Sequence, residues 1–367
     1  MPTFQYSNPE TIHWGPGILR EKLDAELKRV GARRVFVITT KSAVREPALA
    51  PAVQALLGER FAGRFPDIGQ HAPARSVMAA VLAAREARAD ALLSVGGGSP
   101  IDAAKTVAFS LASGLDVTLS DAPARSRSIK LERTLPHLAV PTTLSVAELA
   151  GSAGFTAEGT KEKVGVAAPQ LRPAVVFYDA ELAVKTPLDL WLTTGIRAVD
   201  HAVETLLAPG EHPLPDVAAL DGLRRLRKGL LAVKANPADL QARTECQLGA
   251  WHSYLLPGPA AKGLSHTLGK RLGSRHDIPH GVTSCLLLPH VMRHLAPRAP
   301  ETMKRIAEAL DAPNAAEGVA RLISQLGLPC HLATYKLSDA DLREAVRPVA
   351  SSENSEDDLL CILRAAL

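Results

Sequence analysis

ADALLSVGGGSPIDAAKTVAFSL, residues 89–111, carries the clearest structural signal in this chain. Residues 89–95 predict a buried strand, three glycines and a serine follow at 96–99, and residues 102–111 predict a helix. Glycine lets the backbone approach a ligand closely, and the free N–H groups at a helix start attract anions. The spacing is neither GxGxxG nor a Walker A loop, since no GK[ST] follows. The segment predicts a turn that binds pyrophosphate; the alternative is a glycine turn needed only for packing.

The alternation of strand and helix continues on both sides of this turn. Short apolar runs predict further strands at 33–39, 135–140 and 174–178. Leucines at helical spacing predict a helix that ends at Gly31, and an alanine-rich run predicts another at 76–88. Strands separated by helices predict a mostly parallel sheet with helices on its faces.

Beyond Asp179 the pattern changes, and from about Pro187 onward the segments are rich in Ala and Leu at helical spacing. The predicted helices cover residues 217–231, 240–255, 301–310 and 339–346. The chain therefore divides near residues 180–186 into an α/β half and an all-α half. Ligands bind most often at the carboxyl ends of parallel strands and in clefts between domains.

The overall composition excludes several classes of protein. The chain has 367 residues, of which 46% are hydrophobic and 22% charged, as in a globular protein. No apolar run reaches the roughly 20 residues that span a bilayer, so no membrane partner is expected. The net charge of +4 is dispersed and aromatic residues make up 4%, which disfavours nucleic acid as a partner. A small-molecule substrate is expected instead.

Cysteine usage and the first residues predict a cytoplasmic protein. The four cysteines, Cys246, Cys285, Cys330 and Cys361, form no CxxC pair, so a zinc ribbon is disfavoured and reduced thiols are expected. The start, MPTFQYSNPETIHWGPG, lacks the basic and apolar regions of a signal peptide.

Polar residues in two further places suggest binding chemistry. Thr142 and Thr143 directly follow a predicted strand, where hydroxyls could bind ribose or phosphate; the alternative is a plain threonine-rich strand end. His201, His266 and His280 could supply neutral imidazoles to one divalent ion. The alternative is that each is an ordinary core or surface histidine.

Six motifs occur together in one order: GGGSPIDAAK, PTT, KVGVAAPQLRPAVVFYDAEL, GIRAVDHAVET, GLSHTLGKRLGS and IPHGVTSCLLLPHVM. In this order they resemble the iron-containing, or group III, alcohol dehydrogenase family. The resemblance implies a dehydroquinate synthase-like fold, with an α/β dinucleotide-binding domain of parallel sheet over residues 1–182. An all-α domain over residues 183–367 would carry the metal or substrate site. It also implies NAD or NADP as the cofactor, hydride transfer, and a homodimer or higher homo-oligomer.

Cofactor-binding residues follow from the same resemblance. The family's glycine turn binds the pyrophosphate, and the threonines after the next strand bind the cofactor. The implied cofactor-binding residues are Gly97, Gly98, Ser99, Asp102, Thr142, Thr143 and Lys163. Thr40 occupies the position that often carries an acid beside the adenosine ribose. Without that carboxylate a 2′-phosphate is accepted more easily, so NADPH is expected to be tolerated.

The metal site is where this sequence departs from the family pattern. Family members that hold a divalent ion, iron or zinc, use one Asp and three His, and the histidines fall on His201, His266 and His280. The Asp position is Arg197, and Lys270 replaces a further histidine. At an effective dielectric of about 20, each positive charge within about 4 Å opposes a metal ion by several kcal/mol. Weak metal binding, or none, is therefore expected.

A branch of the family, the maleylacetate reductases, also lacks the Asp and is similar around YDAEL and HAVE. Those enzymes reduce a double bond in a carboxylated substrate, and Arg197 would suit a carboxylate through a bidentate pair. Asp102 and IPHGVTSC, however, resemble the alcohol dehydrogenase branch, so the branch stays open. The leading hypothesis is an NAD(P)-dependent reductase of a small carbonyl, alcohol or carboxylated substrate. Arg197 and Lys270 would stabilise developing negative charge, with His266 as the proton donor.

Four alternatives stay open. Arg197 could instead form a salt bridge with Asp200, Glu204 or a neighbouring helix. The three histidines plus water could hold iron or zinc in an ordinary alcohol dehydrogenase. A sugar-phosphate cyclase-type lyase would need a basic cluster, for which the chain offers Lys262, Arg271 and Arg275. A non-catalytic relative would bind dinucleotide alone.

Overall fold

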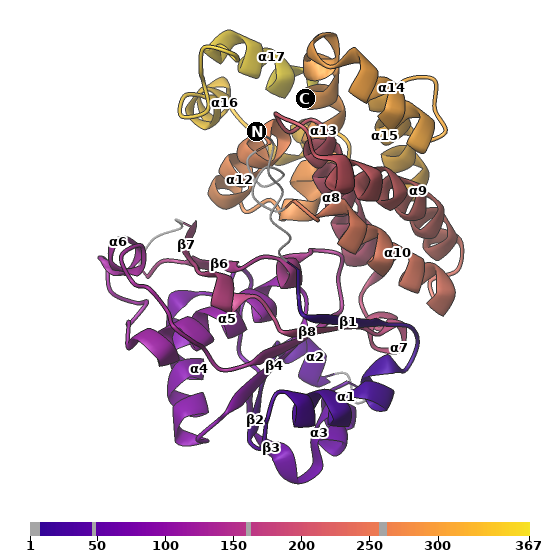
Figure 1. Ribbon diagram of the computed structural model, residues 1–367. Helices are drawn as coiled ribbons and strands as arrows, with labels where there is room; N and C mark the ends of the chain where they lie inside the picture. The colour runs from indigo at the N-terminus through magenta and orange to yellow at the C-terminus, as the bar shows by residue number, and fades with distance from the viewer. Residues whose placement is uncertain (1–7, 46–48, 159–162, 257–262) are drawn as a thin grey trace. The chain divides into compact units, whose positions relative to one another are not determined.

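The structure is a computed structural model that describes residues 8–45, 49–158, 163–256 and 263–367. Contacts within the chain divide it between Thr186 and Pro187 into two compact units (Figure 1). We refer to them as the N-terminal unit and the helical unit.

A six-stranded parallel sheet runs through the N-terminal unit in the order β1-β8-β5-β4-β2-β3. Its strands are β1 (Thr11–Trp14), β2 (Val35–Ile38), β3 (Phe61–Phe65), β4 (Ala91–Gly96), β5 (His137–Pro141) and β8 (Val175–Tyr178). The four strands predicted from the sequence, β2, β4, β5 and β8, are confirmed. The two strands that the prediction missed, β1 and β3, are the edges of the sheet. Both are partly exposed, so neither shows a continuous apolar run.

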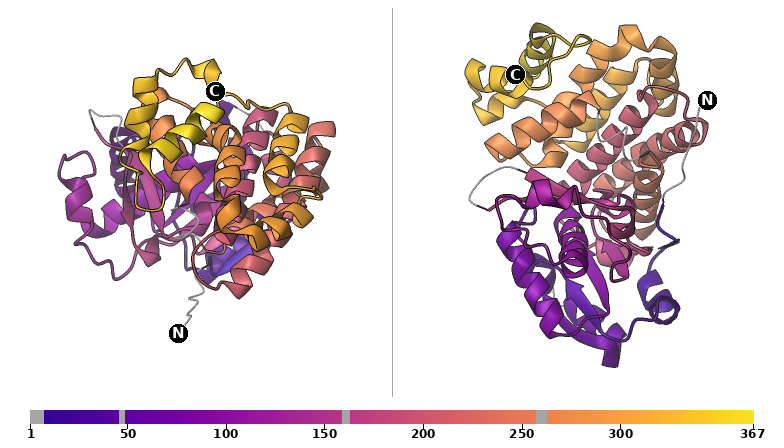
Figure 2. Two further views of the ribbon diagram at one scale, coloured as in Figure 1. Left: turned by 90° about the horizontal axis from the view of Figure 1, so that it is seen from above. Right: turned by 60° about the vertical axis from the view of Figure 1, so that its left-hand side comes forward.

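Helices cover both faces of this sheet. Alternate side chains of β2 point to opposite faces, with Val35 and Val37 in one core and Phe36 and Ile38 in the other. The first core is covered by α1 (Ile18–Arg29) and α3 (Ala50–Leu57), and the second by α4 (Ala74–Glu86) and α5 (Gly98–Ser113). The right-hand view of Figure 2 shows strands of the sheet among the helices of the N-terminal unit.

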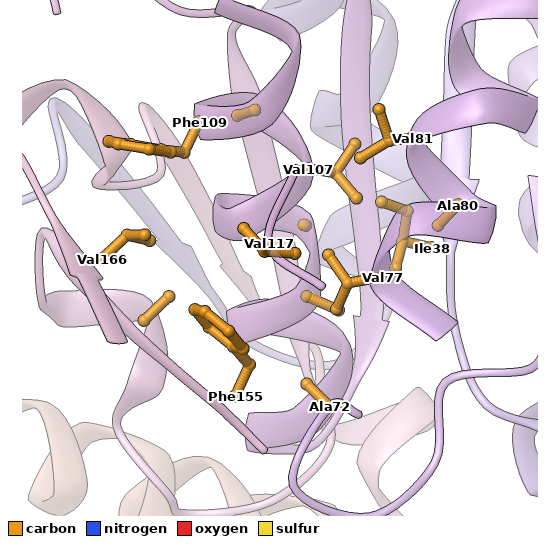
Figure 3. Packing of buried hydrophobic residues seen from close by; sticks show 14 of the residues in the cluster. Ile38, Ala72, Val77, Ala80, Val81, Val107, Phe109, Val117, Phe155 and Val166 are labelled. Carbon is orange, nitrogen blue, oxygen red and sulfur yellow. The ribbon is translucent and has the colours of Figure 1, made fainter. Parts of the chain in front are cut away.

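A hairpin that the sequence analysis missed closes the second core. Strands β6 (Ser152–Thr156) and β7 (Lys163–Ala167) pair antiparallel. Phe155 and Val166 of the hairpin join Val77 and Val107 of the helices in one buried cluster (Figure 3). The hairpin therefore packs over α4 and α5 and has no place in the parallel sheet.

The helix after the glycines begins earlier than predicted. The prediction placed its start at residue 102, whereas α5 begins at Gly98, with Gly97 as its N-cap. Proline is tolerated in the first turn of a helix, so Pro100 does not delay the start. The remaining short elements are α2 (Lys41–Arg45), α6 (Ala122–Ser126), α7 (Ala180–Ala183), η1 (Gly58–Arg60), η2 (Ala147–Leu149) and η3 (Pro169–Leu171).

Described elements of the helical unit are all helices: α8 (Leu188–Leu206), α9 (Pro213–Ala235), α10 (Leu240–Ser253), α12 (Leu264–His276), α13 (His280–Leu295), η4 (Ala296–Arg298), α14 (Pro300–Ala309), α15 (Ala315–Leu326), η5 (Leu332–Tyr335), α16 (Asp339–Val346) and α17 (Glu356–Ala365). The four helices predicted here, α9, α10, α14 and α16, are confirmed. Helix α8 is central, because every residue from 195 to 206 is buried, and it packs against α9, α10, α12 and α13 (Figure 1).

Among the helices described, none combines the length and apolar character needed to cross a membrane. The four cysteines are free thiols; Cys246 and Cys285 are buried, and Cys330 and Cys361 are exposed.

Candidate functional site

The glycine turn lies between β4 and α5. Gly96 ends the strand with a φ of +141°, a backbone conformation that residues with side chains rarely adopt. A Cβ added to Gly97 would lie 3.0 Å from Thr143 Cγ2, and one added to Gly98 would lie 3.2 Å from Ser145 Oγ. Glycine is therefore required here by backbone geometry and by the close approach of residues 143–145.

Both threonines predicted for the cofactor lie beside this turn. The Thr142 N–H donates to the carbonyl of Gly96 at 2.9 Å, which ties the end of β5 to the end of β4. The Thr143 hydroxyl is buried, and no described residue forms a hydrogen bond with it. The turn, the first N–H groups of α5 and the Thr143 hydroxyl together form a cradle suited to an anion.

The other residues predicted to bind the cofactor are spread over the N-terminal unit. Ser99 accepts a hydrogen bond from the His71 N–H at 3.0 Å. Asp102 accepts from the Gly154 N–H at 3.3 Å and so holds the β6–β7 hairpin. Thr40 follows β2, and its hydroxyl pairs with that of Ser42 at 2.9 Å. Lys163 begins β7, and its side chain lies outside what the structure describes.

Arg197 is the centre of a buried polar cluster in the helical unit. Its side chain is buried, and its Nη1 donates to Ser284 Oγ at 3.0 Å and lies 3.4 Å from Asp200 Oδ2. Ser265 and Ser284 also donate to Asp200 Oδ2, at 3.0 and 2.7 Å. The salt bridge between Arg197 and Asp200, left open as an alternative by the sequence, is thus present.

His266 is joined to the same cluster through its two ring nitrogens. Arg197 Nη2 forms a hydrogen bond with His266 Nε2, and a guanidinium can only donate. His266 Nε2 therefore accepts, and a neutral ring carries its proton on Nδ1, which lies 3.4 Å from Glu204 Oε2. Glu204 Oε1 accepts from the His266 N–H at 3.0 Å. Glu204 thus caps the start of α12 and orients the ring of His266.

His201 lies against this cluster but has a different environment. Its ring centroid lies 5.0 Å from that of His266 and 4.5 Å from that of Tyr254. Its Nδ1 is buried, with no hydrogen-bond partner in the described part of the chain. Burial, reinforced by the charge of Arg197, holds the pKa of His201 well below its usual value. Burial therefore favours the neutral form of this imidazole.

Burial also shifts the pKa of each acid in the cluster. It raises the pKa of Asp200, and the Arg197 charge opposes this shift. It raises the pKa of Glu204 further, with the Asp200 charge adding to the effect. Burial lowers the pKa of Arg197. Each shift disfavours the ionised form, so the cluster carries few charges that are not paired.

The remaining predicted residues that the structure describes lie on α12 and α13. His280 is the first residue of α13, and a Cβ added to Gly273 of α12 would lie 3.4 Å from its Nδ1. Lys270 lies one turn beyond His266 on α12 and is exposed. Arg275 forms an ion pair with Glu344, and Lys262 falls outside the described residues.

The donor set does not fit a divalent metal ion. The lone pair of His266 Nε2, which a metal would need, accepts the hydrogen bond from Arg197. Arg197 also adds a positive charge where the family pattern has a carboxylate. Within residues 8–45, 49–158, 163–256 and 263–367, no three or more His, Cys, Asp or Glu side chains are grouped so as to hold a metal ion.

Comparison with known families assigns the chain. Residues 9–180 match the model described as iron-containing alcohol dehydrogenase, and residues 191–359 match the model described as Fe-containing alcohol dehydrogenase family, C-terminal. The chain belongs to the iron-containing alcohol dehydrogenase family. It is an oxidoreductase, and the resemblance stated from the sequence is confirmed.

Curated relatives in this family include several maleylacetate reductases. The protein "Maleylacetate reductase 2" of Cupriavidus pinatubonensis is 34% identical over 88% of this chain and 82% of its own length. The maleylacetate reductase of Burkholderia cepacia is 32% identical over 90% of this chain and 86% of its own length.

Solved structures of iron-containing alcohol dehydrogenase family members share the fold. The maleylacetate reductase of Agrobacterium tumefaciens has a TM-score of 0.85 at 28% identity, covering 100% of this chain and 99% of its own. The iron-containing alcohol dehydrogenase of Corynebacterium glutamicum has a TM-score of 0.85 at 27% identity, covering 100% and 97%.

Two serines of the cluster, Ser265 and Ser284, were missed by the sequence analysis, and Glu204 was named only as a possible salt-bridge partner of Arg197, not as a partner of His266. Ser265 and Ser284 lie within motifs quoted above but gave no signal of their own, because serine is common in helices. Glu204 had one available signal, the glycine at 263. A Cβ at Gly263 would lie 2.0 Å from Glu204 Cδ, so this glycine leaves room for the carboxylate.

Proposed function

We propose that this family member is an NAD(P)H-dependent reductase of a small carboxylated substrate and that it works without a tightly held metal ion. The relatives named maleylacetate reductase support the choice of a carboxylated substrate over a simple alcohol or aldehyde. The observation that carries the proposal is the buried guanidinium of Arg197, bonded to His266 among the residues where the family pattern places a metal.

Arg197 supplies a fixed positive charge in this proposal. A guanidinium in a buried site stabilises negative charge on a substrate oxygen more strongly than it would in water, because the dielectric is low. Asp200, Ser284 and His266 hold it in one orientation, so it needs no rearrangement when charge develops. Lys270, which is exposed, would assist only as a second and weaker cation.

The nicotinamide cofactor, when bound, supplies the hydride. We place its pyrophosphate at Gly97, Gly98 and the start of α5, with Ser99, Asp102 and Lys163 among the surrounding residues. Thr142 and Thr143 would bind beside it. At the adenosine end, Thr40 and Ser42 present two hydroxyls and no carboxylate, which supports acceptance of NADPH as well as NADH.

A proton must also reach the reduced substrate. The sequence favoured His266 as its donor, and that assignment requires Arg197 to release His266 Nε2 first, because Nε2 accepts a hydrogen bond in the present arrangement. His201, buried and with Nδ1 unpartnered in the described chain, is the second histidine to test. A homodimer and a cytoplasmic location stay predictions.

The deciding experiment measures metal content by elemental analysis on protein purified without chelators, together with titration by NADH and NADPH and a substrate screen. We expect well under one metal per chain, binding of both cofactors, and turnover of unsaturated or oxo carboxylates. One iron or zinc per chain, with turnover of simple alcohols lost on chelation, would overturn the proposal. That outcome would establish the metal-dependent alternative with His201, His266 and His280 as ligands.

A further inference from the structure

Lys105 is a lysine of α5 whose side chain is fully buried. Its ammonium donates to the carbonyls of Ala147 at 2.5 Å and Ser152 at 2.8 Å, and it lies 3.5 Å from Asp102 Oδ1. A lysine ammonium has three N–H groups, and here each has an acceptor. A buried charge is costly unless it is fully paired, so this arrangement fixes its partners closely.

The two carbonyls belong to one segment, residues 142–152, which runs from the end of β5 to the start of β6. Ala147 begins η2 within this segment, and Ser152 begins β6. Two further contacts hold the same segment. The Tyr178 hydroxyl donates to Glu148 Oε1 at 2.9 Å, and Arg172 donates to the carbonyl of Leu149 at 3.1 Å. The 142–152 segment is thus fastened to α5 by Lys105 and to β8 by Glu148.

Val146, within the 142–152 segment, has a strained backbone conformation. Val146 has φ of +56° and ψ of +18°, the left-handed region, and it is buried. This conformation is unfavourable for a β-branched residue and persists only where surrounding contacts enforce it. The hydrogen bond from Lys105 to the neighbouring Ala147 carbonyl is such a contact.

Just before the strained residue, the segment places two hydroxyls against the glycine turn. Thr143 Oγ1 would lie 3.1 Å from a Cβ on Gly97, and Ser145 Oγ would lie 3.2 Å from a Cβ on Gly98. Both hydroxyl oxygens are buried, and within the described ranges neither has a hydrogen-bond partner. Buried hydroxyls without partners beside a helix start suit a ligand with acceptor oxygens.

We propose that Lys105 is a positioning residue for the cofactor: it holds the strained 142–152 segment so that the hydroxyls of Thr143 and Ser145 bind phosphate oxygens at the glycine turn. Lys105 is enclosed by protein acceptors and does not touch the cofactor itself. The proposal rests on the proposed function, because it takes the dinucleotide to bind at this turn, and it adds Ser145 to the residues that bind it.

The test is a double-mutant cycle of K105M and S145A, read out as the dissociation constants of NADH and NADPH by fluorescence titration. K105M should weaken binding by about tenfold or more, because it removes the hydrogen bonds that hold the 142–152 segment. S145A should weaken binding by several-fold, because it removes one hydrogen bond to a phosphate oxygen. If Lys105 acts through Ser145, the double variant should bind about as weakly as K105M alone. Cofactor KM should rise while kcat stays within about twofold.

A matched control is K28M, because Lys28 is exposed and forms an i,i+4 pair with Asp24 on the surface of the N-terminal unit. It should bind both cofactors like the wild type. If K105M fails to fold, K105M/V146G takes its place, because glycine removes the backbone strain that Lys105 opposes. Unchanged cofactor binding in a folded Lys105 variant, or strictly additive effects in the cycle, would overturn this proposal alone. Wild-type protein that binds neither NADH nor NADPH would overturn the proposed function as well.

Discussion

Arg197 donates a hydrogen bond to Nε2 of His266, so the imidazole is oriented by a cation of its own chain. Glu204 contacts the same ring from the Nδ1 side, at 3.4 Å. The ring therefore lies between an acid and a guanidinium, and its Nε2 lone pair is engaged.

Restoring the family's donors should create a metal site. In the double variant R197D/K270H, a carboxylate replaces the guanidinium and His266 Nε2 becomes available. We expect bound iron or zinc to rise from a trace to about one per chain, measured by elemental analysis after dialysis against the metal. The single variant K270H keeps Arg197 and serves as the control; it should gain little. No gain in the double variant would show that the three histidines do not converge.

Replacing Arg197 by lysine should not preserve function. Lysine keeps the charge but cannot donate in a planar fork to Asp200, Ser284 and His266 at once. We expect R197K to lose about 100-fold in kcat/KM for a carboxylated substrate, equivalent to about 2.7 kcal/mol, while cofactor binding is retained. Steady-state kinetics with a fluorescence titration of NADPH would check both. Activity within a fewfold of wild type would remove Arg197 from the proposed mechanism.

Gly263 should not tolerate alanine. Its Cβ would lie 2.0 Å from the Glu204 carboxyl carbon, so the carboxylate must move away from His266. We expect G263A to lower the free energy of unfolding by about 1–3 kcal/mol, measured by urea denaturation. In an E204A background the same change should cost much less, since the clash is gone. Equal costs in both backgrounds would mean that Glu204 does not occupy this space.

The buried carboxyl group of Glu148 should make the free energy of unfolding depend on pH. Burial raises its pKa from an ordinary 4.5 to about 7, so between these values the folded chain binds more protons than the unfolded one. The free energy of unfolding should therefore fall as pH rises through this window, by about 3 kcal/mol from this group. E148Q should lack that part of the fall, as seen by urea denaturation at pH 5 and pH 8. E132Q, at an exposed position, is the control and should follow the wild type.

The four cysteine thiols should differ in reactivity: the two buried thiols should react slowly and the two exposed thiols quickly. Burial raises the pKa of Cys246 to about 12 and that of Cys285 further, so neither forms a reactive thiolate near neutral pH. Cys330 and Cys361 are exposed. A colorimetric thiol reagent should titrate two thiols per native chain quickly and all four after denaturation. Fast reaction of Cys246 in the native protein, located by peptide mapping, would contradict its burial.

Buried strands were predictable from the sequence, whereas edge and hairpin strands were not. β4 and β5 are buried at every residue and mostly apolar, because both faces of the sheet are covered there. β1 and β3 are partly exposed, and β6–β7 packs on helices outside the sheet, so none of them shows that pattern. The start of α5 at Gly98 was not predicted, because glycines and a proline at this point ordinarily indicate a turn.

The polar cluster was predictable in part. Its histidines and Arg197 stood out through motif spacing, and the pairing of Arg197 with Asp200 was one alternative that the sequence raised. Ser265 and Ser284 could not be found, because their role depends on α12 and α13 meeting α8 in space. The left-handed backbone conformation of Val146 could not be predicted either, because contacts with residues distant in sequence impose it.

The positive charge that Arg197 brings to this cluster is part of the polypeptide, so it does not depend on the supply of a metal ion. A guanidinium is made on the ribosome with every copy of the chain, stays protonated at any physiological pH, and cannot dissociate, change oxidation state or be taken by a chelator. An enzyme that relies on it has no demand for iron import and no step of metal insertion. It would also escape the loss of activity that oxygen causes where ferrous iron is the cation.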